Sequence, residues 1–213
     1  MAKPASPRWR RRKEERPSEI VAAALASFAE RGFAATRLDD VAARAGVTRG
    51  TLYLYFPSKE ELFKAVVRQF IVPVIADREE MIAAATVPTA ELLGKFIMSF
   101  PDLVTGSALP AIPKLVIAEA RNFPDLAQFY FDEVLKRARA RVRALIRRGV
   151  ERGEFRPVDI DRVFFCLMGP ILAGALWQNV FQPHDDEKLD FRALCHTHLD
   201  LLLNGLLPRE TAS

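Results

Sequence analysis

Cysteine and histidine are both scarce in this chain of 213 residues, and each shortage excludes a class of protein. The two cysteines, Cys166 and Cys195, are too few for a disulfide framework, and both lie in apolar helical stretches. We therefore expect two reduced thiols in the core of a cytoplasmic protein. His196 and His198 are two positions apart and would point to different faces of a helix, so we predict neither a metal site nor a cofactor.

Long apolar runs are also missing, since no stretch of about 18 uncharged apolar residues is present. The nearest candidate, residues 163–181, lacks charge but is interrupted by small and polar residues, namely Gly169, Pro170, Gly174, Gln178 and Asn179. We interpret it as a buried or dimer-interface helix and predict no membrane association. The basic N-terminus is not followed by an apolar segment of the signal-peptide kind.

Two further shortages concern chemistry and fold. No nucleophile is accompanied by a recognisable base, so we predict that the chain is not an enzyme. No segment sustains the alternation of β-branched and polar residues that a strand needs, so we predict an all-α fold with about nine helices.

The positive charge that is present lies mostly at one end of the chain. Residues 1–71 carry 14 Lys and Arg against 8 Asp and Glu, a net charge of +6, whereas the remaining residues carry 17 against 19, a net charge of −2. A basic N-terminal third on a nearly neutral remainder favours a local module that binds a polyanion, although an ordinary basic surface would give the same balance.

The first part of the chain contains a series of helix start and stop signals. We expect residues 1–15 to form a basic flexible tail and a first helix to run from Arg16–Pro17 to Gly32. Thr36 is the expected cap of a second helix, and Gly46 permits a sharp turn after it.

The signals continue beyond that turn. Thr48 can cap a short third helix that ends near Tyr55, and Ser58 can cap a fourth that Pro73 ends. Two short helices around a glycine turn are the layout of a helix-turn-helix.

Residues 36–63 read TRLDDVAARAGVTRGTLYLYFPSKEELF, and the first helix ends in FAERGF. This pattern resembles the DNA-binding signature of the TetR family over residues 16–70. The resemblance implies that a recognition helix beginning at Thr48 enters the major groove of a palindromic operator. Residues 16–71 are therefore the predicted helix-turn-helix DNA-binding domain.

The candidate DNA-binding residues come from this motif and from its physical chemistry. Arg49 can read guanine, Gly50 lets the backbone approach DNA, and Lys59 would hold a phosphate. For Tyr53 the alternative is a mainly packing role. The full predicted set is Thr36, Arg37, Thr48, Arg49, Gly50, Thr51, Tyr53, Tyr55 and Lys59.

Residues 72–213 continue the helical pattern, and the resemblance implies that they form a helical domain that binds a small-molecule effector and dimerises. Residues 114–127 are similar to the subgroup with AefR-like C-terminal domains. An apolar and aromatic set could line the ligand pocket, although such residues at helical spacing also build cores. The candidates are Phe96, Phe100, Ile117, Phe123, Phe129, Tyr130, Phe165, Met168 and Trp177.

The last two predicted helices, near residues 159–181 and 188–206, are too apolar to be exposed alone, so we predict a homodimer through them. Seven arginines on one face of the segment 124–153 could bind an anion, but a solvated and partly neutralised surface is favoured.

Together these features predict a cytoplasmic repressor that a small apolar or aromatic ligand releases from double-stranded DNA. Three alternatives stay open: activation instead of repression, a regulator without a ligand, and a helical binding protein that no longer uses DNA.

Overall fold

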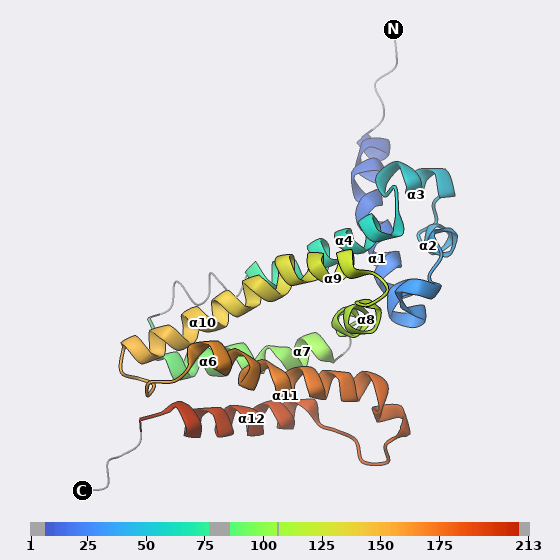
Figure 1. The fold of residues 1–213 in the computed structure, drawn as a ribbon. Helices are drawn as coiled ribbons and strands as arrows, with labels where there is room; N and C mark the ends of the chain where they lie inside the picture. The colour runs from blue at the N-terminus through green and yellow to red at the C-terminus, as the bar shows by residue number, and fades with distance from the viewer. Residues whose placement is uncertain (1–6, 77–85, 106, 209–213) are drawn as a thin grey trace, which may run out of the picture. The chain divides into compact units, whose positions relative to one another are not determined.

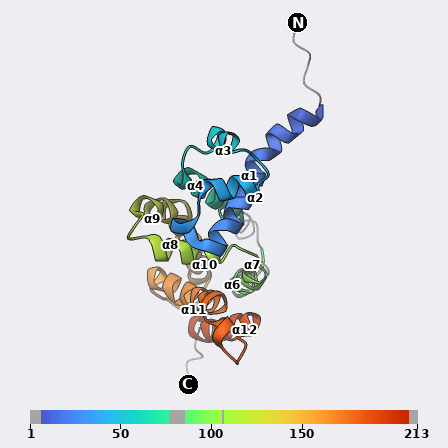
Figure 2. The ribbon, with the colours of Figure 1, turned by 90° about the vertical axis from the view of Figure 1, so that its right-hand side faces the viewer.

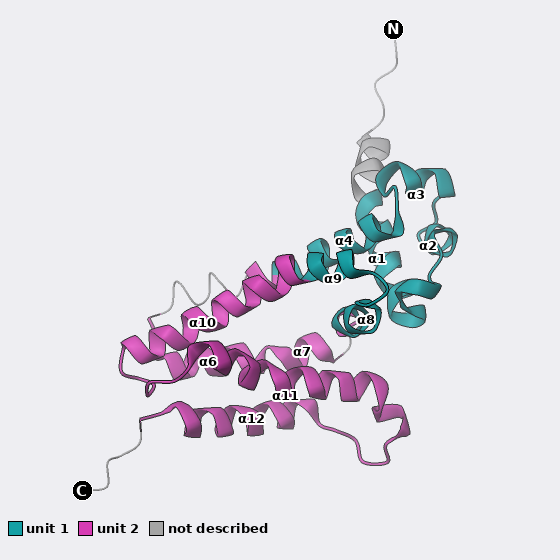
Figure 3. Cartoon of the chain, in the orientation of Figure 1, with its two compact units in different colours: residues 1–73, 111–130 teal, residues 74–110, 131–213 magenta. Residues whose placement is uncertain are grey.

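The computed structural model describes residues 7–76, 86–105 and 107–208, with side chains from Arg16 onward. Over these ranges the chain is helical and contains no strand, which confirms the predicted all-α fold (Figure 1). The chain divides into two compact units (Figure 3). Unit 1 comprises residues 1–73 and 111–130, and unit 2 comprises residues 74–110 and 131–213.

Six helices of unit 1 are described, and Figure 2 gives a second view of them. They are α1 (Pro7–Ala35), α2 (Leu38–Arg44), α3 (Arg49–Tyr55), α4 (Lys59–Phe70), α8 (Ala111–Glu119) and α9 (Pro124–Tyr130). The first helix begins at Pro7, before the predicted start at Arg16–Pro17, and Pro17 lies inside it. Of the predicted tail, residues 1–6 lie outside the described ranges. The expected break at Gly32 is present, since this glycine has a φ of 78°.

Apolar side chains of α1 and α4 form the core of unit 1. Ile20, Ala24, Phe33, Phe63 and Val66 are fully buried. The rings of Phe33 and Phe63 meet edge to face, with centroids 5.7 Å apart. Because the apolar residues of each helix recur with the helical period, one face of each is buried and the opposite face stays polar.

The segment 111–130 packs with the N-terminal helices as part of unit 1, while the predicted domain boundary between residues 16–71 and 72–213 stays a prediction. Helix α8 packs against α1, and α9 packs against α4. The ring of Phe123 lies 4.8 Å from that of Phe33, edge to face, and Glu119 accepts a hydrogen bond from the Ala34 N–H at 3.3 Å. These contacts join residues far apart in sequence, so local sequence patterns do not predict them.

Unit 2 is built mainly from four helices, of which α11 and α12 lie side by side (Figures 1 and 2). Its described elements are α6 (Thr89–Met98), α7 (Phe100–Val104), the π-helical turn η1 (Phe131–Leu135), α10 (Lys136–Glu151), α11 (Ile160–Val180), the 3₁₀ turn η2 (Gln182–His184) and α12 (Phe191–Leu206). The segment 89–104 is thus divided into α6 and α7, with Pro101 in the first turn of α7.

Aspartates start the last two long helices. Asp159 accepts hydrogen bonds from backbone N–H groups of the first turn of α11, and Asp190 does the same for α12. Leu167 and Ile171 of α11 and Phe191 of α12 then enter the core of unit 2.

The thiols of unit 2 differ in exposure. Cys195 is buried as predicted, but Cys166 is exposed, so the prediction of two core thiols was wrong for Cys166. The physical reason is that α11 buries one face in its own unit and leaves Phe165 63% exposed and Trp177 44% exposed on the other. Among the described residues, α11 is also the one helix long and apolar enough to cross a membrane. Core helices of soluble proteins have the same length and composition, so this property does not indicate a membrane span.

We expect Gly174→Ala to destabilise unit 2. A Cβ at this position would lie 2.4 Å from Cδ2 of Leu194 and 2.9 Å from Cε2 of Phe191, so α12 would have to move. The expected loss is about 1–3 kcal/mol, measured as a lower urea midpoint at fixed protein concentration. Gly169→Ala in the same helix is the control, because nothing lies within 4 Å of its added carbon. Equal midpoints for the two variants would contradict this close packing of α12 on α11.

Candidate nucleic-acid interface

Helices α2 and α3 are joined by a turn that glycine makes possible. Gly46 has a φ of 65°, in the left-handed region that other residues rarely adopt. Thr48 then caps α3 by accepting a hydrogen bond from the Thr51 N–H at 3.2 Å. On the opposite side of α3, Leu52 is fully buried and fixes the helix to the core of unit 1. The glycine turn and the Thr48 cap are both as predicted.

The outer face of α3 carries most of the predicted DNA-binding residues. Arg49 and Gly50 are exposed, Tyr53 is 39% exposed, and Thr51 and Tyr55 are half-buried. At the start of α2, Arg37 is exposed as well. This face therefore presents a guanidinium group, a hydroxyl group and a phenol ring on a short helix that the core holds in place.

Arg49 is held by side chains from two helices. Its Nη1 donates a hydrogen bond to Oδ2 of Asp39 at 3.3 Å, and its Nε lies 3.2 Å from Oδ1. Its Cζ also lies 5.4 Å from the ring centroid of Tyr53. A hydrogen bond with Tyr53 and the negative charge of Asp39 raise the pKa of Arg49, so this group stays positively charged.

Thr36 has a different role from the predicted one. It is 2% exposed, and its hydroxyl lies 2.6 Å from the Gly32 carbonyl oxygen and 3.2 Å from that of Ser27 as a hydrogen-bond donor. The residue that caps α2 by position is Arg37, which makes no side-chain cap hydrogen bond. The Thr36 hydroxyl thus ties down the end of α1, and the predicted cap was wrong. The predicted DNA contact of Thr36 stays a prediction.

Lys59 is also engaged inside the protein. Its Nζ donates to the carbonyl oxygens of Phe33, Ala34 and Thr36 at 2.7, 3.0 and 3.1 Å. An ammonium group has three N–H donors, and these three acceptors match that number, while the predicted contact with a phosphate stays a prediction. The last carbonyls of a helix lack partners within the helix and carry partial negative charge, which explains why a cation is bound there. Burial lowers the pKa of Lys59, and the charges of Glu60 and Glu119 oppose this shift.

Two residues that the sequence analysis did not select belong to the same surface. Leu54, on α3, is 77% exposed, and an exposed apolar side chain on a recognition helix fits the methyl group of thymine. Asp39, on α2, pairs with Arg49. The signal for Leu54 was its place between two tyrosines on a short helix, whereas the Asp39–Arg49 pair required the fold.

The predicted ligand-binding residues are divided between the two units. Ile117, Phe123, Phe129 and Tyr130 lie in unit 1, and Phe96, Phe100, Phe165, Met168 and Trp177 lie in unit 2. Several make specific contacts within their own unit. Phe129 lies under the guanidinium of Arg68, and the rings of Phe96 and Phe100 are 5.3 Å apart.

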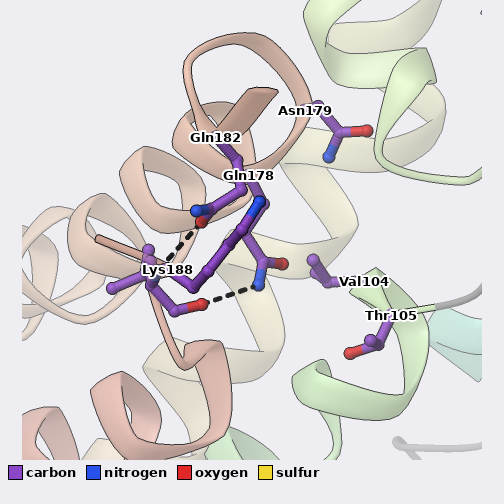
Figure 4. Close-up of a pocket in the computed structure, with 7 residues that line it drawn as sticks. Val104, Thr105, Gln178, Asn179, Gln182 and Lys188 are labelled. Atoms are coloured by element: carbon purple, nitrogen blue, oxygen red, sulfur yellow. Dashed lines mark hydrogen bonds between the residues drawn. The ribbon is translucent and has the colours of Figure 1, made fainter. Parts of the chain in front are cut away.

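A surface pocket of about 350 Å³ is present in unit 2, at the ends of α7 and α11 (Figure 4). The Gln178 side chain donates to the Leu189 carbonyl at 3.2 Å, and Gln182 accepts from the Leu189 N–H at 2.9 Å. None of the nine predicted ligand-binding residues lines this pocket. Its lining residues are Val104, Thr105, Gln178, Asn179, Gln182, Lys188 and Leu189.

The arginines of α10 mostly bind groups of unit 2, which supports the favoured interpretation of a neutralised surface. Arg148 donates to the Val87 carbonyl at 2.9 Å, Arg141 donates to the Ile75 carbonyl, and Arg143 pairs with Asp161. Arg139 lies 5.6 Å from the ring centroid of Phe165. Across the described residues no cluster of potential metal ligands occurs.

Comparison with known proteins gives matches to both parts of the chain. Residues 20–66 match the family model described as "Bacterial regulatory proteins, tetR family", and residues 92–191 match "Tetracyclin repressor-like, C-terminal domain". The second description does not name the AefR-like subgroup, so that finer resemblance stays a prediction.

Individual relatives match over most of their length. The "HTH-type transcriptional repressor KstR2" of Mycobacterium tuberculosis is 32% identical over 193 residues, which cover 90% of this chain and 92% of the relative. A crystal structure of the "transcriptional regulator FadR from Bacillus subtilis in complex with stearoyl-CoA" has a TM-score of 0.75 and 26% identity, covering 88% of this chain and 98% of that one. The structure of the "ketosteroid transcriptional regulator KstR2" has a TM-score of 0.70 and 27% identity, covering 91% and 96%.

We expect Lys59→Met to destabilise unit 1, because three carbonyl oxygens at the end of α1 would lose their cationic donor. The expected loss is about 1–3 kcal/mol, seen as a lower urea midpoint. Lys64→Met is the control on the same helix, since its ion pair with Glu61 is partly exposed and worth less than about 1 kcal/mol. If both variants unfolded alike and Lys59→Met alone reduced the salt dependence of DNA binding, the phosphate contact would be the better interpretation.

Proposed function

Because the chain belongs to the TetR family of bacterial regulatory proteins, we propose that it represses transcription as a cytoplasmic homodimer, which a small apolar ligand releases from a palindromic operator. The observation that carries the DNA-binding part is the outer face of α3. That face combines an exposed cationic side chain, Arg49, with Tyr53 and Leu54, while Leu52 on the opposite side is fully buried.

The physical case for reading DNA with α3 rests on rigidity and on chemistry. A recognition helix must be held firmly so that its side chains meet base edges in the major groove. Leu52 and the Thr48 cap provide that support within unit 1. Arg49 offers the donors that recognise guanine, and the Tyr53 hydroxyl can bind a phosphate oxygen.

Dimerisation through α11 and α12 is supported by the apolar surface that these helices leave uncovered. Phe165, Leu172 and Trp177 of α11 are each at least 36% exposed, and Leu201 of α12 is 66% exposed. A twofold four-helix arrangement would bury such a surface. Ala175, His198 and Leu206 of the same two helices are instead buried within the protomer.

The ligand class is inferred from two relatives together with the apolar composition of unit 2. One relative is described as bound to stearoyl-CoA, and another is named a ketosteroid regulator. Both names point to ligands with a large apolar part. We propose the same broad class for this chain, bound in unit 2 near the predicted ligand-binding residues of that unit, of which Phe96 is buried in its core. Ligand and DNA would then oppose one another through a coupling free energy of about 1–3 kcal/mol.

The DNA-binding proposal is tested by selection from a pool of random duplex DNA. We expect the wild type to enrich a palindrome whose half-sites lie about one helical turn apart, and binding to weaken steeply as salt rises. Arg49→Ala should lose about 1–3 kcal/mol of binding free energy per half-site contact, measured by fluorescence anisotropy. Arg147→Ala removes an arginine that is also exposed, but from α10, outside both proposed interfaces, and should bind as the wild type does.

The same duplex tests the ligand class. Stearoyl-CoA or a steroid, added to the complex, should lower the anisotropy in a saturable way. Enrichment of no sequence by the wild type at about 100 mM salt would contradict the DNA-binding proposal itself, since specific regulators bind tightly under such conditions. Release by neither compound would contradict the ligand class only.

The dimer interface is tested by charge insertion. Leu201→Glu places a carboxylate on the exposed face of α12, and we expect it to shift the mass measured by light scattering from dimer to monomer. Leu54→Glu introduces the same charge on α3 and should leave the mass unchanged. A dimeric Leu201→Glu protein would place the interface elsewhere.

A further inference from the structure

The pairing of Asp39 with Arg49 joins the two helices of the helix-turn-helix at the surface proposed to face DNA. Asp39 lies in the first turn of α2, and Arg49 is the first residue of α3. The carboxylate lies 3.2 Å from Nε and accepts a hydrogen bond from Nη1 at 3.3 Å. The guanidinium also lies over the ring of Tyr53, 5.4 Å from the centroid. Arg49 is therefore restrained by two side chains although its own side chain is 66% exposed.

We propose that Asp39 is a positioning residue that sets the base specificity of α3 by holding Arg49 in one orientation, an inference that rests on the proposed DNA-binding function. A free arginine side chain loses considerable rotamer entropy when it is fixed against a base. The Asp39 pair and the Tyr53 ring impose part of that order before DNA arrives. The affinity for the matching base pair therefore increases relative to the others.

The pair leaves Arg49 able to bind a base. A guanidinium group has five N–H donors, and its contacts with the two oxygens of Asp39 do not use all of them. The remaining donors can meet the two acceptors of guanine, O6 and N7, in the major groove. Asp39 itself has no favourable partner on a phosphate backbone.

The negative charge of Asp39 adds a second contribution to specificity. Close to DNA, a carboxylate is repelled by the phosphates, which weakens binding to every sequence. At the base pair that Arg49 recognises, its oriented hydrogen bonds offset this loss of affinity. At any other base pair, the repulsion between Asp39 and the phosphates stays uncompensated. Removal of Asp39 should accordingly strengthen binding to unrelated DNA and weaken the preference for one base pair in each half-site.

Asp40 offers a matched control next to Asp39. It also lies in the first turn of α2, and it pairs with Arg31 of α1 at 2.5 Å instead of with Arg49. Asp39→Asn and Asp40→Asn remove the same charge from adjacent positions of one helix. A difference between them in base preference therefore reports the contact with Arg49 and not the net charge of the domain.

The experiment is the selection of random duplex DNA by the full-length wild type, Asp39→Asn and Asp40→Asn proteins, read as the preference for each base at each position. We expect Asp39→Asn to lose at least about fivefold discrimination at one position per half-site, and Asp40→Asn to keep it. Circular dichroism melting of each protein confirms that the variants are folded. In an Arg49→Ala background, Asp39→Asn should cause no further loss of discrimination, because Asp39 acts through Arg49.

Three outcomes would overturn the inference. The first is an unchanged preference at every position in Asp39→Asn, and the second is an equal change in Asp40→Asn. The third is a further loss of discrimination in the Arg49→Ala background. In each of these the wild type still selects a sequence, so the proposed function stands. Failure of the wild type to select any sequence would overturn the proposed function and this inference together.

Discussion

The capping of the C-terminal end of α1 is the constraint on which the rest of unit 1 depends. Three carbonyl oxygens there share the ammonium group of Lys59, and the adjacent ring of Phe33 is fully buried. Phe33 contacts Phe63 of α4 and Phe123 at the start of α9, so one residue links helices from distant parts of the sequence. The hydroxyl of Thr36 binds to the same end. Because α2 begins two residues after Thr36, the capping of α1 also sets the position of the helix-turn-helix.

The arginines of α10 and Arg49 of α3 have different physical roles. Those of α10 donate to carbonyl oxygens or pair with carboxylates of unit 2, as Arg148 and Arg143 do. Arg49 instead lies on an exposed helix face, paired with a carboxylate that DNA phosphates would repel. The number of arginines therefore says little about nucleic-acid binding, whereas the partner of each one says a great deal.

Local signals in the sequence predicted the helices and the turn at Gly46 because these depend on neighbouring residues. The cap at Thr48 and the start of α11 at Asp159 are of the same kind. The roles of Thr36 and Lys59 could not be predicted in this way. Both side chains bind carbonyl oxygens at the end of another helix, so their partners depend on tertiary packing.

Dependence on tertiary packing also explains the other features of the structure that the sequence did not predict. Residues 111–130 join unit 1 through contacts such as Phe33 with Phe123, which sequence spacing does not reveal. Cys166 is exposed because α11 is apolar on the face that its own unit leaves uncovered, and apolar composition alone does not tell a core from an interface. The pairing of Asp39 with Arg49 is likewise a product of the turn between α2 and α3.

The central claim, that α3 reads DNA through Arg49, is tested most directly by replacing single guanines of the selected duplex with 7-deazaguanine. This change removes the N7 acceptor and leaves base pairing intact. The account predicts one position per half-site at which the replacement weakens wild-type binding by about fivefold or more, with no effect on Arg49→Ala. Wild-type binding that is insensitive at every guanine, or an equal loss in Arg49→Ala, would contradict it.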